Sequence, residues 1–294
     1  MLVRFMSDFQ SKLWFTYRKD MLRIEPSAYT SDAGWGCMMR TGQSLLAQAF
    51  VHIILGRDWR YHQQPTEEVV QKYCNILSWF ADEPERYYSI HNIAKAGVHL
   101  EKRIGDWFGP ATVAHALNVR VSDIERAAID GQPKMARASM ESVGPNFYEH
   151  QSKTSESTSW KPVVILLPAR FGLEKLTERY INNLKRLFRL PQFLGIAGGR
   201  PGRSLYFVAS QGNELFYFDP HFVKPRATQE ELSCYPSIVR LCYHCNVIRS
   251  MDILEMDPSM LLGFLIRSAD DLVDLCTRLK TEMEHGYPLL TIVE

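Results

Sequence analysis

One cysteine stands where its thiol could act as a nucleophile. Cys37 follows Gly34-Trp35-Gly36 and opens a run in which apolar residues recur every three or four positions, the spacing of a buried helix. A helix N-terminus lowers the pKa of a thiol, and an imidazolium neighbour lowers it further, so a reactive thiolate can form near neutral pH. The glycines leave room for a substrate backbone beside the sulfur. Position alone suits a small buried hydrophobic cysteine equally well.

A carboxylate and an imidazole lie two residues apart in Asp219-Pro220-His221. The segment ends a β-rich run, so an extended backbone would place Asp219 and His221 on one face of the strand. A carboxylate beside an imidazole holds its tautomer and stabilises its charged form. The segment therefore suggests that His221 is the base for Cys37 and that Asp219 orients it. A strand ending in a turn, with His221 hydrogen-bonded to a neighbour, is the structural alternative.

A second group of side chains offers a competing chemistry, because thiolate and imidazole are ligands for zinc. Its members cluster within twelve residues: Cys234, Cys242, His244 and Cys245. The spacing lacks two paired ligand knuckles, so we expect neither a metal site nor any other cofactor.

Composition narrows the classes of function. Of the 294 residues, 46% are hydrophobic and 23% charged, the balance of a globular enzyme with a substantial core. The formal net charge of +1 gives no overall field that would attract nucleic acid or anionic lipid. We find neither a signal peptide nor a stretch long enough to span a membrane. Six cysteines in this context indicate reduced thiols in a cytosolic or nuclear compartment, and we expect a cytoplasmic protein.

The hydrophobic pattern predicts mainly helices in the first half and mixed helices and strands in the second. A helix is expected over Phe5–Tyr17, a buried helix from Cys37 to Gly56, and mainly helical structure from about Thr66 to Val121. The polar run 151–159 reads as an exposed loop. The later elements are a strand at Val163–Leu167, a helix at Leu173–Leu190, a hairpin formed by Leu205–Ser210 and Leu215–His221, and a helix at Asp270–Lys280 capped by Ser268.

Several motifs, in one order, resemble the autophagins, the autophagy-related protein four family of cysteine proteases. The similarity runs through most of the chain and is weakest from Arg120 to Ser159. The motifs are Phe15-Thr16-Tyr17-Arg18-Lys19, Tyr29 to Arg40 around Gly34-Trp35-Gly36-Cys37, Leu55-Gly56-Arg57-Asp58-Trp59, Ile104-Gly105-Asp106-Trp107-Phe108-Gly109-Pro110, Gly198-Gly199-Arg200-Pro201 and Phe218-Asp219-Pro220-His221.

The resemblance implies an α/β (α+β) papain-like fold with a small, largely helical subdomain. We expect residues 1–66 and 160–294 to form the catalytic domain and residues 67–159 the auxiliary one. It implies a catalytic Cys37, His221 and Asp219, with Tyr17 helping to bind the oxyanion. It also implies that Trp107 and a loop from Gly198 to Arg203, including Gly199, Arg200 and Pro201, shape a narrow groove for a glycine-containing tail. Without the resemblance, Tyr17 and Trp107 would be core aromatics and the loop an ordinary turn.

The implied substrate is a ubiquitin-like modifier of the autophagosome membrane, autophagy-related protein eight. Family members cut after its C-terminal glycine, either to process the precursor or to release the modifier from phosphatidylethanolamine. The expected protein is a monomer that contacts the membrane only transiently, through its substrate, and binds no nucleic acid. Two alternatives remain: an inactive module that binds the modifier without cutting it, and a thiol acyltransferase or transglutaminase.

Overall fold

The computed structural model describes residues 2–61, 65–127, 136–138, 160–228, 231–232, 242–283 and 288–290. Its helices are α1 (Leu2–Ser11), α2 (Cys37–Ile54), α3 (Glu67–Ser78), α4 (Ile90–Val98), α5 (Pro110–Ala127), α7 (Ile181–Leu187) and α10 (Ala269–Thr281), with short 3₁₀ turns at Glu178–Tyr180 and Ile253–Glu255. Its strands are β1 (Arg18–Lys19), β2 (Ala136–Ala138), β3 (Val163–Arg170), β4 (Phe193–Arg200), β5 (Arg203–Gln211), β6 (Glu214–Phe218), β7 (Lys224–Pro225), β8 (Arg249–Asp252) and β9 (Ser259–Ile266).

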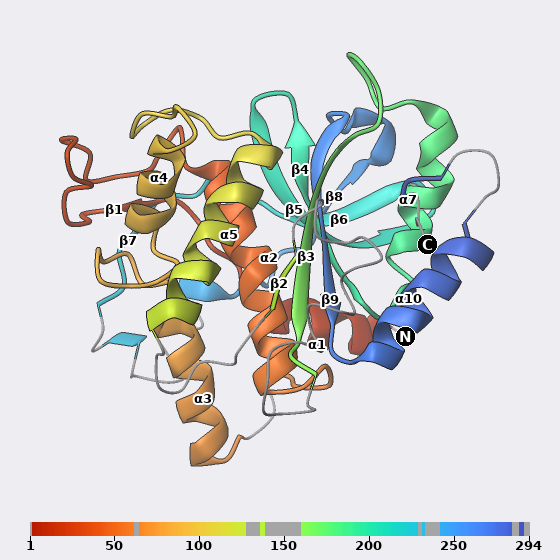
Figure 1. Cartoon of the computed structure of the whole chain (residues 1–294), viewed down its shortest axis with the longest axis horizontal. Helices are drawn as coiled ribbons and strands as arrows, with labels where there is room; N and C mark the ends of the chain where they lie inside the picture. The colour runs from red at the N-terminus through yellow and green to blue at the C-terminus, as the bar shows by residue number, and fades with distance from the viewer. Residues whose placement is uncertain are drawn as a thin grey trace.

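A seven-stranded sheet divides the molecule, with the strand order β2-β3-β9-β4-β5-β6-β8. Helices α2, α4 and α5 lie on one side of it in Figure 1, and α7 and α10 lie on the other. Strand β9 shows the resulting alternation: Leu261 and Leu265 enter the core beneath α2, while Leu262 and Phe264 enter the core on the opposite face. This period of two is what a sheet covered on both faces requires. The α/β class expected from the sequence is confirmed, because helices cover both faces of a mixed sheet.

Helix α2 packs against the sheet at close range, where strand β9 carries a glycine. A Cβ atom on Gly263 would lie 2.6 Å from the side chain of Leu45. The absence of that atom lets the helix approach the sheet. Helix α2 begins at Cys37 and ends at Ile54, close to the helix that the sequence predicts.

The prediction of a helix over Phe5–Tyr17 is wrong in its second half, because α1 ends at Ser11. The following backbone is extended and pairs with distant segments: the Trp14 amide donates to the Tyr243 carbonyl, and the Tyr17 amide to the Pro220 carbonyl. Such long-range pairing overrides the local helical spacing. It also brings Tyr17 beside the predicted base.

Two later elements differ in their bounds. The helix expected from Leu173 begins only at Glu178, because the Thr177 amide turns back to the Phe171 carbonyl across Gly172. Strand β3 continues through Pro168 to Arg170, and the described part of β2 pairs with it only as far as Ile165. A proline is compatible with that unpaired edge.

The hairpin of β5 and β6 and the last helix agree with the sequence. Gln211 pairs with Glu214 across a two-residue turn, and the Ser268 hydroxyl caps α10 by accepting from the Asp271 amide. The expected loop at 151–159 lies outside the described residues. The division into a catalytic domain and a helical subdomain over 67–159 stays a prediction.

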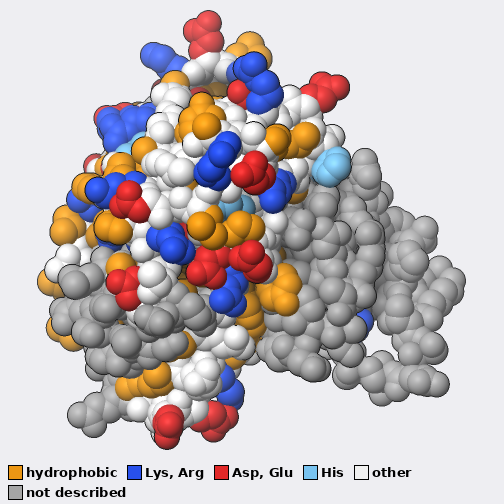
Figure 2. Space-filling view, turned by 90° about the vertical axis from the view of Figure 1, so that its left-hand side faces the viewer, with side chains coloured by type: hydrophobic (Ala, Val, Ile, Leu, Met, Phe, Trp, Pro, Cys, Tyr) orange, Lys and Arg blue, Asp and Glu red, His pale blue; other side chains and the backbone are white. Residues whose placement is uncertain are grey.

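The described surface mixes both signs of charge. Figure 2 shows lysine and arginine side chains interspersed with aspartate and glutamate over the described part of one face. In the part of the chain that the structure describes, no helix combines the length and apolar character needed to cross a membrane.

Candidate active site

The turn before Cys37 is fixed by a buried carboxylate. The Asp32 carbonyl accepts from the amides of Trp35 and Gly36, and its carboxylate accepts from the Arg18 amide at 2.7 Å. A Cβ atom on Gly36 would lie 2.3 Å from that carboxylate, so the turn requires glycine there. Helix α2 then starts at Cys37, whose thiol is only 1% exposed.

The Asp219-Pro220-His221 segment follows strand β6 instead of extending it, because β6 ends at Phe218. The prediction that a shared strand face aligns the two side chains is therefore wrong. A turn does so: Asp219 Oδ1 accepts from the His221 amide at 3.0 Å and lies 2.5 Å from His221 Nδ1. This geometry leaves Nε2 as the nitrogen available to the thiol.

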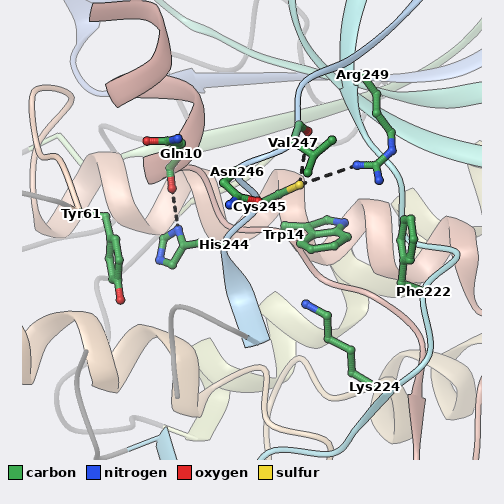
Figure 3. A pocket seen from close by; sticks show the side chains of 10 residues that line it. All are labelled: Gln10, Trp14, Tyr61, Phe222, Lys224, His244, Cys245, Asn246, Val247 and Arg249. Atoms are coloured by element: carbon green, nitrogen blue, oxygen red, sulfur yellow. Dashed lines mark hydrogen bonds between the residues drawn. The ribbon is translucent and has the colours of Figure 1, made fainter. Parts of the chain in front are cut away.

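Two residues of the N-terminal segment donate hydrogen bonds to backbone carbonyls of this loop. The Trp14 indole donates to the Asp219 carbonyl at 2.7 Å, and the Tyr17 amide donates to the Pro220 carbonyl at 3.0 Å. No sequence signal identifies Trp14 as a partner of this loop. Trp14 and Phe222 also line a hollow of about 260 Å³, and the Lys224 amine lies 4.1 Å from the centre of the Trp14 ring. Figure 3 shows the side chains that line this hollow.

Cys37 and His221 are in hydrogen-bond contact, and each shifts the pKa of the other. Burial acts to raise the pKa of the Cys37 thiol, but hydrogen bonds with His221, the Ser204 amide and Trp107 outweigh it and lower that pKa. Burial acts to lower the pKa of His221, but Asp219 and Cys37 raise it to about 9. Both shifts favour a thiolate beside an imidazolium.

The Asp219 carboxylate remains ionised. Burial opposes its charge, but the hydrogen bonds from His221 lower its pKa below the usual range. Arg203, at the start of β5, adds a contact of 3.4 Å from its guanidinium to Asp219 Oδ2. No sequence pattern links Arg203 to Asp219.

Tyr17 lies at the same centre. Its ring stands perpendicular to the His221 ring, with centroids 5.4 Å apart. Burial raises the pKa of its phenol, and the Cys37 thiolate raises it further. The phenol therefore stays protonated at physiological pH and keeps a hydrogen to donate.

Trp107 contacts the sulfur directly. Its indole nitrogen donates to Cys37 Sγ at 3.1 Å, while 42% of the residue remains exposed. The adjacent Phe108 is buried against Gly97 of α4, where a Cβ atom would lie 2.1 Å from the Phe108 ring. Trp107 is thus a partly exposed cover over a buried thiol, anchored by its neighbour.

The segment from Gly198 to Arg203 is a β-hairpin and not the loop that the resemblance implied. Gly198, Gly199 and Arg200 belong to β4, and Pro201-Gly202 form the turn into β5. Arg200 forms an ion pair with Glu255. The hairpin lies beside the thiol, since the Ser204 amide on β5 donates to Cys37.

The side chains considered as zinc ligands contact protein atoms at the positions that the structure describes. His244 uses Nε2 with the Tyr73 hydroxyl at 2.6 Å and Nδ1 with the Gln10 carbonyl at 2.8 Å. The Cys245 thiol lies 3.4 Å from the Val247 carbonyl. Cys234 lies outside the described residues, and the described ones contain no group of three or more His, Cys, Asp or Glu side chains arranged for a metal.

Comparison with known proteins agrees with this geometry. The peptidase C54 catalytic domain family matches residues 2–278. Cysteine protease ATG4B of Gallus gallus is 35% identical over 98% of this chain and 79% of its own length. Cysteine protease atg4 of Emericella nidulans is 37% identical over 98% and 75%, and cysteine protease ATG4A of Homo sapiens is 35% identical over 95% and 75%. The chain belongs to the peptidase C54 family and is a thiol protease of the autophagy pathway.

Proposed function

We propose that this protease cleaves the amide bond after the C-terminal glycine of a ubiquitin-like autophagy modifier, autophagy-related protein eight. Two substrates follow: the precursor with a peptide extension and the form conjugated to phosphatidylethanolamine. Both scissile bonds are amides, so one thiol mechanism serves both. The observation that carries the proposal is the contact between Cys37 and His221 beneath Trp107, with pKa shifts that favour a thiolate beside an imidazolium.

The proposed reaction uses four side chains in sequence. Cys37 Sγ attacks the glycine carbonyl, and the Tyr17 phenol donates to the developing oxyanion. His221 gives its proton to the leaving amine, which breaks the carbon–nitrogen bond and leaves a thioester on Cys37. His221, now neutral and held by Asp219, takes a proton from water, whose oxygen attacks the thioester; the carbon–sulfur bond breaks and leaves the Cys37 thiolate beside the His221 imidazolium.

The cover over the thiol supports a preference for glycine. With Cys37 1% exposed beneath Trp107 and beside the β4–β5 hairpin, little room is open to a substrate at the sulfur. A glycine tail has no side chain to place there, and a larger residue would have to move the indole. Gly198, Gly199, Arg200 and Pro201 are proposed to border this space.

The test uses a modifier with a C-terminal peptide extension and measures the product mass. The chain should release the extension and leave a product ending in glycine. Cys37→Ser should bind the modifier and lose cleavage by about a thousandfold or more, because a hydroxyl is far harder to ionise than a thiol. Near-normal turnover by Cys37→Ser would refute the assignment.

The same assay separates the alternatives. A module that only binds the modifier would give no product with the wild-type chain, and an acyltransferase would need an added amine acceptor. Release of the modifier from phosphatidylethanolamine-containing vesicles would establish delipidation. We further propose that the protein acts as a monomer in the cytoplasm and meets the autophagosomal membrane through its substrate.

A further inference from the structure

A large hollow on another part of the molecule has five basic side chains among the residues that line it. It has a volume of about 760 Å³ and lies between α1, α7, the segment after α2 and the β5–β6 turn. Its basic residues are Lys12, Arg57, Lys185, Arg186 and Arg189. Among the described residues that line it, Asp8 alone is acidic. The lining therefore carries a formal surplus of four positive charges, in a chain whose net charge is +1.

Asp8, which this surplus already counts, is shared with a cation outside the lining. Its two oxygens lie 3.1 Å from Lys12 Nζ and 3.0 Å from Arg60, a further cation. Lys12 itself is only 7% exposed, so its charge is held in a position with little water. A buried cation that shares its carboxylate favours a further anion nearby.

Three other cations have neutral partners or solvent around them. Arg57 lies 3.1 Å from the imidazole of His52, and the Lys185 amine donates to the Asn213 side chain at 3.1 Å. Arg189 projects from the end of α7 and is exposed. Arg57 belongs to Leu55-Gly56-Arg57-Asp58-Trp59, a motif that the proposed proteolysis leaves without a role.

The positive potential reaches the neighbouring imidazole. Burial lowers the pKa of His52, and Lys12 and Arg57 lower it further, to about 2. A neutral His52 can accept the hydrogen bond from Arg57, which leaves the other guanidinium nitrogens of Arg57 for a ligand.

We propose that this hollow binds clustered phosphate groups, either on the headgroup of an anionic phospholipid or on a soluble inositol phosphate. Guanidinium groups match phosphate oxygens in pairs, and lysine adds a point charge. The volume falls within the range of about 300–1,000 Å³ typical of small-molecule sites. None of the residues that line the hollow belongs to the Asp219-Pro220-His221 loop, so the proposed phosphate site is separate from the proposed site of cleavage.

Calorimetric titration of the wild-type chain with inositol 1,4,5-trisphosphate tests the site. Binding should weaken by about tenfold or more in Arg57→Gln/Arg189→Gln, because two charge-assisted contacts are lost. The matched control is Lys19→Gln/Arg23→Gln, which removes the same charge from the β1 side of the molecule, away from α7 in Figure 1. The control should bind within about twofold of wild type. Circular dichroism checks that all three proteins are folded.

A second arm identifies the source of the phosphate. Vesicles of phosphatidylcholine with and without phosphatidylinositol 4,5-bisphosphate are sedimented with each protein. Binding to a lipid headgroup is supported if the wild-type protein is retained on the anionic vesicles, if Arg57→Gln/Arg189→Gln is not retained, and if the trisphosphate competes with retention. Trisphosphate binding without vesicle retention supports a soluble ligand. The proposal is overturned if the wild-type chain does not bind the trisphosphate, or if Arg57→Gln/Arg189→Gln and Lys19→Gln/Arg23→Gln weaken binding equally.

Discussion

The catalytic pair predicts a pH window at the scale of single residues. The thiolate is lost as pH falls through the lowered pKa of Cys37, and the imidazolium is lost as pH rises through about 9. We expect kcat/KM to follow a bell whose upper limb lies near pH 9. Alkylation of Cys37 by iodoacetamide needs only the thiolate, so it should lack the upper limb.

The matched variant for this prediction is Asp219→Asn, which removes the charge that raises the pKa of His221. Its upper limb should move to lower pH, and kcat should fall by a factor of about 10⁴ if orientation is as important as in serine triads. An unchanged upper limb in Asp219→Asn would show that another group sets it. An alkylation profile that rises only at the pH of an ordinary thiol would contradict the ion pair.

Trp107 makes two separable contributions, because its nitrogen binds the sulfur while its ring covers it. Trp107→Phe should keep the cover and lose the donor to Cys37 Sγ. Alkylation at pH 6 should then slow by about three- to tenfold as the pKa of Cys37 rises. The ratio of kcat/KM for glycine over alanine at the cleavage site should stay near the wild-type value in Trp107→Phe and fall in Trp107→Ala. If both variants keep that ratio, Trp107 does not select glycine.

At the scale of elements, the β4–β5 hairpin offers two glycines with different constraints. A Cβ atom on Gly199 would lie 1.9 Å from the Arg203 carbonyl, so Gly199→Ala must shift the start of β5 and the Ser204 amide that donates to Cys37. Gly202 has φ +74° but no atom within 4 Å of such a Cβ. Gly199→Ala should slow alkylation at pH 6 by about tenfold. Gly202→Ala should lose about 1 kcal/mol of stability and keep the rate.

Thermal melts and alkylation rates of both glycine variants, measured side by side, check this prediction. The comparison controls for the chemistry of the substitution, since each adds one methyl group to the same hairpin. Equal alkylation rates in the two variants would mean that the position of the Ser204 amide does not govern the thiolate.

Local sequence patterns correctly predicted those elements whose bounds are set by neighbouring residues. The glycine-rich turn followed by helical spacing placed the start of α2 at Cys37, and Ser268 marked the cap of α10. Elements that depend on distant pairing were misjudged: residues after Ser11 are extended because they pair with the Tyr243 and Pro220 carbonyls. The alignment of Asp219 with His221 was expected from a strand and comes from a turn. The motifs pointed to Cys37 and Trp107 separately, but spacing alone could not derive their contact.

At the scale of the whole molecule, a buried ionic network joins segments that lie far apart in the sequence. Arg40 of α2 binds Asp32 through two nitrogens, at 2.7 and 3.0 Å, and Asp82 through a third at 2.7 Å. Arg18 donates to the carbonyls of Pro225 and Cys242 and lies 4.0 Å from Asp82. The network thus connects the turn before Cys37 with α2, the helical region and the segment after His221.

Arg40→Gln tests how much the molecule depends on this network. The change leaves Asp32 and Asp82 buried without the guanidinium that pairs with both, and such a loss typically costs about 3–5 kcal/mol. Arg278→Gln is the matched control, because Arg278 also pairs with two carboxylates, Asp274 and Glu282, but on the surface of α10. Exposed pairs contribute about 0–1 kcal/mol, so the urea midpoint of Arg278→Gln should barely move.

Since Asp32 also fixes the turn before Cys37, Arg40→Gln should slow alkylation of Cys37 even at temperatures where the variant remains folded. Equal stability losses in the two variants would show that the buried network adds nothing beyond a surface ion pair, and the turn would then owe its geometry to the hydrogen bonds of Asp32 alone.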